Sequence, residues 1–241
     1  MTLCSIIIVT YNALKYTKLC YESILKYTSI PYEIIFVDNS STDGTKEFLS
    51  RLQSPTIRVI FNNQNQGFAY GCNQGARIVN SNAVLFLNND TIVTKNWLNN
   101  LFCCLNSHPQ VAAVVPVSNL AAGSQIPVTY KNIKEMDRFA CHFNKINPSK
   151  WRQTETASGF CLLVKKMVFD LLNGFDEQFG IGFFEDTDLI IRIRQAGFRV
   201  MIAGDTFVHH FGSRTFRANN ICIDSWMNIN NAKFIRKHYG G

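Results

Sequence analysis

The chain has 241 residues, of which 46% are hydrophobic and 17% are charged, so it can bury a core as one large or two small domains. Its formal net charge of +7 indicates an anionic partner but does not choose among nucleic acid, phosphorylated small molecules and an anionic membrane surface. No recognisable nucleic-acid module is present, and no apolar run reaches the roughly 18 to 20 residues of a membrane span.

The N-terminal stretch MTLCSIIIVTYN has neither the basic region nor the cleavage site of a signal peptide, so we expect a cytoplasmic protein. Attachment of the protein to the inner face of the membrane is an alternative that the sequence leaves open. Eight cysteines are scattered along the chain without a Cys-x-x-Cys pair and without a histidine at ligand spacing. We expect them to be buried as small hydrophobic residues.

Apolar runs rich in β-branched residues alternate with helical patterns through the first half of the chain. CSIIIVTYN predicts a strand, and Leu19, Ile24 and Leu25 give the next segment a helical spacing. The alternation continues as strand, helix, strand, helix and strand over residues 32–40, 42–52, 57–63, 67–79 and 83–90. Continuous apolar strands alternating with helices predict an α/β fold with a mainly parallel sheet that helices cover on both faces.

The second half of the chain is less regular. VAAVVPV predicts another strand, and residues 118–156 are polar and expected to be irregular. SGFCLLVKKMVFDLL predicts a strand and a helix, EDTDLIIRIRQAGF a helix, RVMIA a strand that leads to VHHFGSRTF, and WMNINNAKFIRKHY a basic helix. There is no internal repeat and no linker, so we expect one domain over residues 1–241.

Polar side chains follow four of the predicted strands at the point where each strand ends. In parallel sheets ligands bind beyond the carboxyl ends of the strands, so we expect these side chains to meet in one crevice. They are Thr10, Tyr11 and Asn12, then Asp38 and Asn39, then residues 62–65, and finally Asn88, Asn89 and Asp90.

Asp90, flanked by two amides, suits a divalent cation that already carries phosphate oxygens, because Mg²⁺ in such sites takes only one or two protein carboxylates. His209 and His210, which follow a late strand, are candidates for a second ligand. The alternative is that Asp90 caps a helix that starts near Lys95.

Asp38 and Gly67 each allow two interpretations. Asp38 can accept a hydrogen bond from a pyrimidine ring, but an Asx turn within DNSSTDG explains it as well or better. Gly67 lies where a backbone can approach a pyrophosphate at a helix N-terminus. The repeat of Gly67, Gly71 and Gly75 fits close helix packing equally well.

The segment FFEDTDL is the strongest local signal. Glu185, Asp186 and Asp188 crowd the first turn of a predicted helix, where one capping carboxylate would suffice. Mutual repulsion and burial raise a carboxyl pKa while the helix dipole lowers it, and this balance suits a general base. For Asp188 we prefer an ion pair with Arg192 one turn later.

These motifs together resemble the inverting glycosyltransferases of family 2, which have the GT-A fold. The resemblance covers nearly the whole chain, and its specificity lies in the order and spacing of segments that are weak singly. The segments are SIIIVTYN, IIFVDNSSTDGT, NNQNQGFAYGCNQG, LFLNNDT, GFDEQFGIGFFEDTDLIIRIRQAGF and VHHFGS. It implies a Rossmann-type, mixed but mainly parallel sheet, with the nucleotide bound by about 1–117 and the acceptor by about 118–241.

The resemblance also implies roles for single residues. It assigns the nucleotide sugar to Thr10, Tyr11, Asn12, Asp38, Asn65, Gly67, Asn88 and Asn89. Asp38 would read the uracil or thymine edge. Asp186 aligns with the general base, and Glu185 lines the acceptor side.

The metal motif departs from the family pattern. Asn88-Asn89-Asp90 takes the place of Asp-x-Asp, and its first aspartate is an asparagine. A bound Mn²⁺ or Mg²⁺ would therefore depend on Asp90 and one late histidine. The segment VHHFG contains two histidines that could align with the metal ligand of the family. We prefer His210 and keep His209 as the alternative.

The predicted function is metal-dependent transfer of a hexose from a nucleoside-diphosphate sugar, with UDP-sugars first, to a glycan, lipid-linked or protein acceptor. The alternative is a sugar-nucleotide-binding module without turnover, which the weakened metal motif allows. A receiver domain is disfavoured because no acid pair follows the first strand, and a dinucleotide oxidoreductase because no Gly-x-Gly-x-x-Gly follows it. Nucleic acid is not an expected partner, while peripheral membrane contact and homo-oligomer formation stay open.

Overall fold

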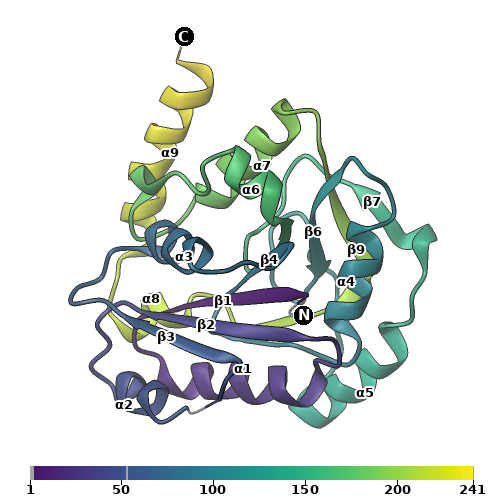
Figure 1. Ribbon diagram of the computed structural model, residues 1–241, viewed down its shortest axis with the longest axis horizontal. Coiled ribbons are helices and arrows are strands. Elements are labelled where there is room, and N and C mark those ends of the chain that lie inside the picture. The colour runs from purple at the N-terminus through teal and green to yellow at the C-terminus, as the bar shows by residue number, and fades with distance from the viewer. Residues whose placement is uncertain (1–2, 53, 241) are drawn as a thin grey trace.

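The computed structural model describes residues 3–52 and 54–240 and contains one large β-sheet with helices on both faces (Figure 1). The strands of this sheet are β1 (Cys4–Thr10), β2 (Tyr32–Asp38), β3 (Ile57–Phe61), β4 (Ala83–Leu87), β6 (Val111–Val117), β7 (Trp151–Gln153), β8 (Cys161–Lys165) and β9 (Arg199–Phe207). They lie in the order β3-β2-β1-β4-β8-β6-β9-β7. Two short strands, β5 (Thr91–Ile92) and β10 (His209–His210), form a separate antiparallel ladder.

The strand directions make this a mixed sheet. Strands β3, β2, β1 and β4 run parallel, as do β6 and β9, whereas β8 and β7 are antiparallel to their neighbours. The predicted α/β fold with a mixed, mainly parallel sheet is confirmed. Because β8 lies between β4 and β6, both halves of the chain build the same sheet. The division of nucleotide and acceptor binding near residue 117 stays a prediction.

Helices cover both faces of the sheet. They are α1 (Leu14–Tyr27), α2 (Thr45–Ser50), α3 (Phe68–Arg77), α4 (Trp97–Leu105), α5 (Ile133–Phe143), α6 (Lys166–Leu171), α7 (Glu185–Gln195), α8 (Arg214–Ala218) and α9 (Ile223–Tyr239), with 3₁₀ turns at Pro148–Lys150 and Glu177–Phe179. Helices α3, α6 and α7 share one core cluster, and α1, α2 and α4 share the other. Figure 1 shows α3, α6 and α7 above the strands and α1 and α2 below them.

The central strand β1 shows why its sequence is an unbroken apolar run. Successive side chains of a strand point to opposite faces, so Ile7 packs in the α3 cluster while Ile6 and Ile8 pack in the α1 cluster. All three side chains are fully buried. A strand covered on both faces needs apolar residues at every position, and the alternating pattern of a half-exposed strand is absent from it.

The expectation that residues 118–156 are irregular is wrong in part, because α5 and β7 lie there. The Asn132 side chain accepts a hydrogen bond from the Glu135 N–H, and the Glu135 carboxylate accepts one from the Lys131 N–H, so α5 starts at a capping arrangement. Met136 and Ala140 are its buried residues. Such a short apolar stripe is difficult to recognise by periodicity.

The eight cysteines are all free. The expected burial is confirmed for Cys4, Cys20, Cys72, Cys104 and Cys161, and Cys103 is half-buried. The expectation is wrong for Cys141 and Cys222, which are exposed.

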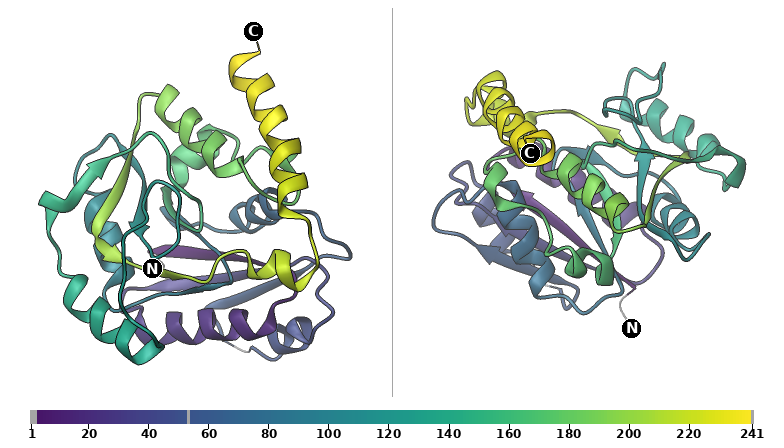
Figure 2. Two further views of the ribbon diagram at one scale, coloured as in Figure 1. Left: turned by 180° about the vertical axis from the view of Figure 1, so that it is seen from behind. Right: turned by 90° about the horizontal axis from the view of Figure 1, so that it is seen from above.

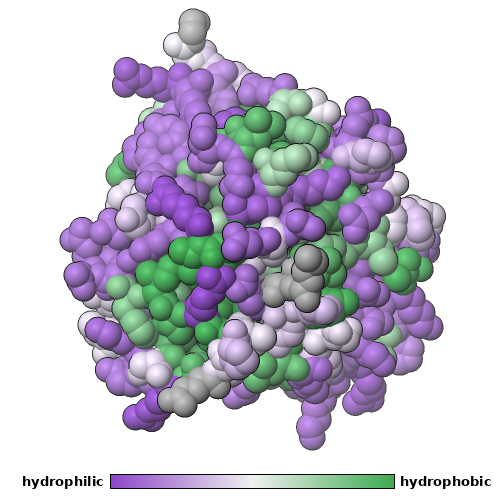
Figure 3. Space-filling view, in the orientation of Figure 1, coloured by the Kyte–Doolittle hydropathy of each residue, from purple (hydrophilic) through white to green (hydrophobic). Residues whose placement is uncertain are grey.

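Two helices mark the ends of the molecule. Helices α5 and α9 lie at opposite ends of the molecule, and α9 extends away from the body (Figures 1 and 2). Apolar side chains gather on the part of the surface over α3 and β3 (Figure 3). Phe61, the last residue of β3, and Ile78, at the C-terminal end of α3, are each 39% exposed. None of the described helices combines the length and apolar character that a membrane span requires.

The three spaced glycines of α3 and its start serve close packing. A Cβ atom at Gly71 would lie 2.9 Å from the Val9 side chain, and one at Gly75 would lie 2.7 Å from the Ile7 side chain, both in β1. Gly67 has φ +90°, and a Cβ there would lie 2.1 Å from the Gly180 carbonyl oxygen. The packing interpretation therefore accounts for all three glycines.

Replacing Gly67 by alanine should destabilise the fold for two reasons. With φ +90° and ψ 172°, Gly67 lies in a region that essentially only glycine adopts, where a Cβ costs about 1–3 kcal/mol, and the contact with the Gly180 carbonyl adds an overpacking cost of about 1–3 kcal/mol. Gly197→Ala is the matched control, because Gly197 has φ +84° but no atom within 4 Å of the added Cβ. Urea denaturation should show the larger loss of unfolding free energy for Gly67→Ala, and equal losses would contradict the close contact.

Candidate functional site

A cavity of about 500 Å³ opens at the carboxyl ends of the parallel strands. One wall is formed by residues that follow β1 to β4, and the other by residues 157–160, residues 181–187, His210 and side chains of α8 and α9. The predicted site residues that line it are Tyr11, Asn65, Asn88, Asn89, Asp90, Glu185, Asp186 and His210. The structure thus brings the NND segment, the ED pair and a histidine into one cavity.

Four predicted residues are not part of the described lining: Thr10, Asn12, Asp38 and Gly67. The fully buried Asp38 carboxylate accepts from the Thr10 hydroxyl at 2.8 Å and from the Ser41 hydroxyl at 2.5 Å and N–H at 3.0 Å. The two bonds from Ser41 are those of a turn, whereas the bond from Thr10 links Asp38 to the end of β1. Its neighbour Asn39 lines the cavity instead.

Asn12 and Gly67 also support the loops behind the lining. The Asn12 side chain accepts from the N–H groups of Thr42 and Asp43 at 2.7 and 3.2 Å, so it holds the loop that follows β2. The Gly67 N–H donates to Asn65 Oδ1 at 2.9 Å, and its carbonyl accepts from Asn39 Nδ2 at 3.1 Å. Gly67 therefore contacts two lining residues, whereas Asn12 holds the loop behind them.

Asp90 and His210 form a close pair on the cavity wall. His210 Nε2 lies 3.2 Å from Asp90 Oδ1, because the β5–β10 ladder pairs His210 with Thr91. The other Asp90 oxygen accepts from the Arg214 N–H at 3.0 Å. Helix α4 has Asn96 at its N-cap position and no side-chain cap, so the alternative that Asp90 caps this helix is wrong.

His210 meets two partners through its two ring nitrogens. Nδ1 lies 2.9 Å from the Leu120 carbonyl oxygen and donates to it. Nε2 and Asp90 Oδ1 face each other 3.2 Å apart, so a hydrogen bond between them requires a protonated Nε2, whereas a cation would bind the lone pair of a neutral Nε2. Phe160 stacks on the His210 ring with centroids 5.0 Å apart. Burial opposes the charged imidazole, but the hydrogen bond and the charge of Asp90 outweigh burial and raise the pKa of His210.

The ligand atoms that Asp90 and His210 offer fit a divalent cation. One carboxylate oxygen and one imidazole nitrogen face the same point, and both belong to ligand types that Mn²⁺ accepts. Among the described residues no group of three or more His, Cys, Asp or Glu side chains gathers at one point. Asp90 and His210 would therefore hold a cation only together with ligand oxygens such as those of a diphosphate.

His209 has a different environment. Its Nδ1 lies 2.6 Å from the Tyr130 hydroxyl, and its ring packs edge-on against Phe211 with centroids 4.6 Å apart. Burial, reinforced by the charge of neighbouring His210, lowers the pKa of His209 to about 4. Of the two candidate histidines, the structure places His210 in the lining of the cavity.

Asp186 is fixed at the start of α7 by peptide N–H groups. Its Oδ2 accepts from the Gly159 N–H at 2.6 Å, and its Oδ1 accepts from the Thr187 N–H at 2.7 Å. Burial raises the pKa of Asp186 above its ordinary value, although these hydrogen bonds oppose the rise. An oriented carboxylate with a raised pKa suits a general base.

Glu185 is the buried partner of Asp186 in the cavity wall. Its side chain is 6% exposed, and Oε2 has no hydrogen-bond partner among the described residues. Burial, followed by the charge of Asp186, raises the pKa of Glu185 to about 8. The raised pKa favours the protonated Glu185 carboxyl, and a protonated carboxyl in the cavity lining can donate a hydrogen bond.

Asp188 turns away from the cavity, as its predicted ion pair requires. Its carboxylate lies 2.8 Å from Arg192 Nε, 2.6 Å from Lys237 Nζ and 2.8 Å from His238 Nε2. The predicted pair with Arg192 is confirmed. The further partners on α9 connect the first turn of α7 to the C-terminal helix.

The apolar side of the cavity is built from separate segments that no single motif connects. Phe183 and Phe216 line it with ring centroids 4.8 Å apart, and Met227 of α9 joins them. Thr215 of α8 also lines it and donates to Asn89 Oδ1 at 3.0 Å. The segment VHHFGSRTF is recognisable in the sequence. Only the fold places its last residues beside the segment 88–90.

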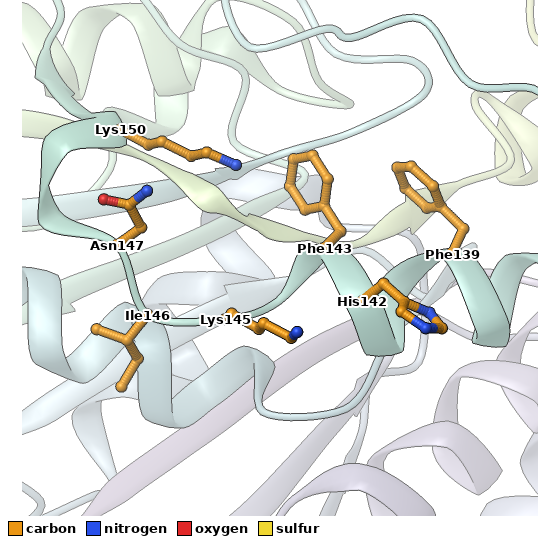
Figure 4. Close-up of a pocket in the computed structure, with 7 residues that line it drawn as sticks. All are labelled: Phe139, His142, Phe143, Lys145, Ile146, Asn147 and Lys150. Carbon is orange, nitrogen blue, oxygen red and sulfur yellow. The ribbon is translucent and has the colours of Figure 1, made fainter.

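A second hollow of about 540 Å³ lies beside α5 and has a different chemistry (Figure 4). Its lining is Phe139, His142, Phe143, Lys145, Ile146, Asn147 and Lys150. This lining contains no carboxylate and no predicted site residue. The candidate site is therefore the cavity of Asp90 and Asp186.

Comparison with known proteins gives one family. The family model described as glycosyl transferase family 2 matches residues 5–172. Glycosyltransferase GlyG of Streptococcus pneumoniae serotype 4 is 32% identical over 102 residues, which cover 42% of this chain and 34% of that protein. An N-acetylglucosaminyl-diphospho-decaprenol L-rhamnosyltransferase of Mycobacterium tuberculosis is 24% identical over 241 residues, which cover 88% of this chain and 77% of the relative.

A solved structure shares the fold. The mannosyltransferase PcManGT from Pyrobaculum calidifontis, in complex with GDP-Man and Mn²⁺, superposes with a TM-score of 0.70 at 21% identity. The match covers 97% of this chain and 64% of that chain. This chain thus spans about a third of GlyG and less than two thirds of the mannosyltransferase chain.

The buried Glu185 should make the stability of the protein depend on pH. Its pKa is raised from 4.5 to about 8 on folding, so the folded protein holds a proton that the unfolded chain releases between these values. Stability from this group is full below pH 4.5 and declines as pH rises to about 8, by at most ~1.4 kcal/mol per pH unit.

Glu185→Gln removes this group, so the variant should gain stability relative to the parent as pH rises from 5 to 8. Urea denaturation at several pH values measures the difference. Glu22→Gln, the same change at an exposed position, is the control. A difference that stays constant with pH would mean that Glu185 is ionised in the folded protein.

Proposed function

Because this chain belongs to glycosyl transferase family 2, we propose that it transfers a hexose from a nucleoside-diphosphate sugar to a glycan, lipid-linked or protein acceptor, with inversion at the anomeric carbon. The observation that carries this proposal is that one cavity is lined by both the Asp90–His210 pair and Asp186. The first is suited to a cation-bound diphosphate and the second to the deprotonation of an acceptor hydroxyl.

The strand-end wall supplies the donor contacts in this proposal. Tyr11, Asn39 and Asn65 line the part of the cavity that follows β1 to β3. The resemblance gives the base-reading role to Asp38, and its neighbour Asn39 lines the cavity. Asn39 Nδ2 donates to the Gly67 carbonyl and Oδ1 accepts from Asn62 Nδ2, so the base would contact the turn that these residues build. UDP-sugars are therefore the first donors to test.

Asp90 and His210 would hold a Mn²⁺ or Mg²⁺ ion on the donor diphosphate. A cation bound there would offset the negative charge that grows on the departing diphosphate. The Leu120 carbonyl fixes the His210 tautomer, and the Arg214 N–H orients the Asp90 carboxylate. The PcManGT complex with Mn²⁺ supports the choice of cation.

Asp186 acts as general base in the transfer step. Its carboxylate takes the proton of the acceptor hydroxyl as that oxygen attacks the anomeric carbon and the bond to the diphosphate oxygen breaks. The Gly159 and Thr187 N–H groups hold the carboxylate in place during the step. The neutral Glu185 carboxyl beside it donates a hydrogen bond to a sugar hydroxyl.

The apolar side of the cavity favours an acceptor with an apolar portion. Phe183, Phe216 and Met227 form this side, and Met227 is 42% exposed, so the apolar surface continues to the outside. The mycobacterial relative is named for a diphospho-decaprenol substrate. A lipid-linked acceptor, reached at the inner face of the membrane, is therefore the first acceptor to test.

Asp186→Asn should abolish turnover while leaving donor binding intact. Loss of a general base lowers kcat by about 10²–10⁴-fold, whereas the asparagine keeps the shape of the site. The measurement is release of nucleoside diphosphate from UDP-sugars in the presence of Mn²⁺, together with nucleotide affinity by calorimetry.

Asp224→Asn, an exposed position on α9, is the matched control and should behave as the parent. Full activity of Asp186→Asn would show that another group is the base. No turnover by the parent with any donor, combined with tight nucleotide binding, would favour the non-catalytic binding module.

A further inference from the structure

The segment before α7 has an unusual backbone conformation. Phe183 and Phe184 both have φ +74°, in the left-handed region that bulky residues rarely adopt. Two such residues in succession persist only where surrounding contacts hold them. The segment ends directly at Glu185, so its conformation decides where α7 begins and where the Asp186 side chain lies.

Asn230 of α9 supplies contacts of this kind. Its side chain is fully buried, and its Nδ2 donates to the carbonyl oxygens of Phe179 at 2.6 Å, Gly182 at 2.7 Å and Phe183 at 3.2 Å. Its Oδ1 has no partner among the described residues. Three carbonyls that converge on one nitrogen require a donor there, and a carboxylate or an alkyl group would leave them unpaired.

Other contacts fasten α9 to the body without using Asn230. The ring of Phe234 packs on Phe184 with centroids 5.3 Å apart. Lys237 Nζ lies 2.6 Å from both Asp176 and Asp188. The attachment of α9 and the hydrogen bonds to residues 179–183 can therefore be disturbed separately.

We propose that Asn230 is a positioning residue of the transferase site: it holds residues 179–184 in the conformation from which α7 presents Asp186 to the cavity. Asn230 is not among the residues that line the cavity, but Gly182 and Phe183, whose carbonyls it binds, are. The proposal rests on the proposed function, because Asp186 as general base is the group that is positioned.

Asn230→Ala should change kcat and KM differently. We expect kcat to fall by about tenfold or more, since a small displacement of a catalytic group has effects of this size. Donor KM should stay within about threefold, because Asn230 makes no hydrogen bond to the loops after β1, β2 and β4 that carry Tyr11, Asn39 and Asp90. Nucleoside-diphosphate release from a UDP-sugar with Mn²⁺ gives both values.

Two control variants separate positioning from loss of helix attachment. Asn231→Ala makes the same change at the adjacent, exposed position of α9 and should leave kcat within about twofold of the parent. Lys237→Ala removes the ion pairs of α9 with Asp176 and Asp188. Asp188 keeps Arg192 and His238 as partners, so kcat should fall by less than about threefold.

Hydrogen exchange tests the same contact without activity. Amides of residues 180–187 should exchange faster in Asn230→Ala than in the parent or in Asn231→Ala. If the parent turns over no donor, the proposed function fails, and the exchange result still decides whether Asn230 holds this segment.

The inference is overturned by parental kcat in Asn230→Ala, by an equal loss of kcat in Lys237→Ala, or by unchanged exchange of residues 180–187. A rise of donor KM in parallel with the loss of kcat would overturn it as well, because the effect would then extend to the donor wall.

Discussion

Burial of acidic side chains in the first turn of α7 sets the requirements for the elements around it. Asp188 is balanced by Arg192 and by two residues of α9, so its charge is compensated on the side away from the cavity. Asp186 has no cation within ion-pair distance among the described residues and instead accepts hydrogen bonds from peptide N–H groups. Glu185 has neither, and burial raises its pKa to about 8. One turn thus presents an oriented carboxylate beside a neutral one.

The part of the cavity around Asp90 depends on a pairing between distant parts of the chain. The β5–β10 ladder is only two residues long, yet it places His210 against Asp90 and leads directly into α8. Strand β8, inserted between β4 and β6, brings Gly159 and Phe160 to the same edge of the sheet. Residues from the second half of the chain therefore complete a crevice that the first four parallel strands open.

The sequence predicted those parts of the site that follow from local pattern. Buried parallel strands end at one edge, which is why Tyr11, Asn65 and Asp90 were expected in one crevice and line one cavity. Polar groups beyond a strand can also serve the loops, and the sequence does not distinguish the two uses, so Asp38 supports a turn. The positive φ of Phe183 depends on contacts from α9, which no local pattern encodes.

The central claim is that a cation-bound diphosphate and the base Asp186 occupy one cavity. Anomalous diffraction at the manganese edge, from crystals grown with Mn²⁺ and UDP, tests it most directly. The account predicts one manganese peak bound by Asp90 Oδ1, His210 Nε2 and the UDP diphosphate, with Asp186 facing the same cavity. Manganese bound away from Asp90 and His210, or UDP bound outside this cavity, would contradict it.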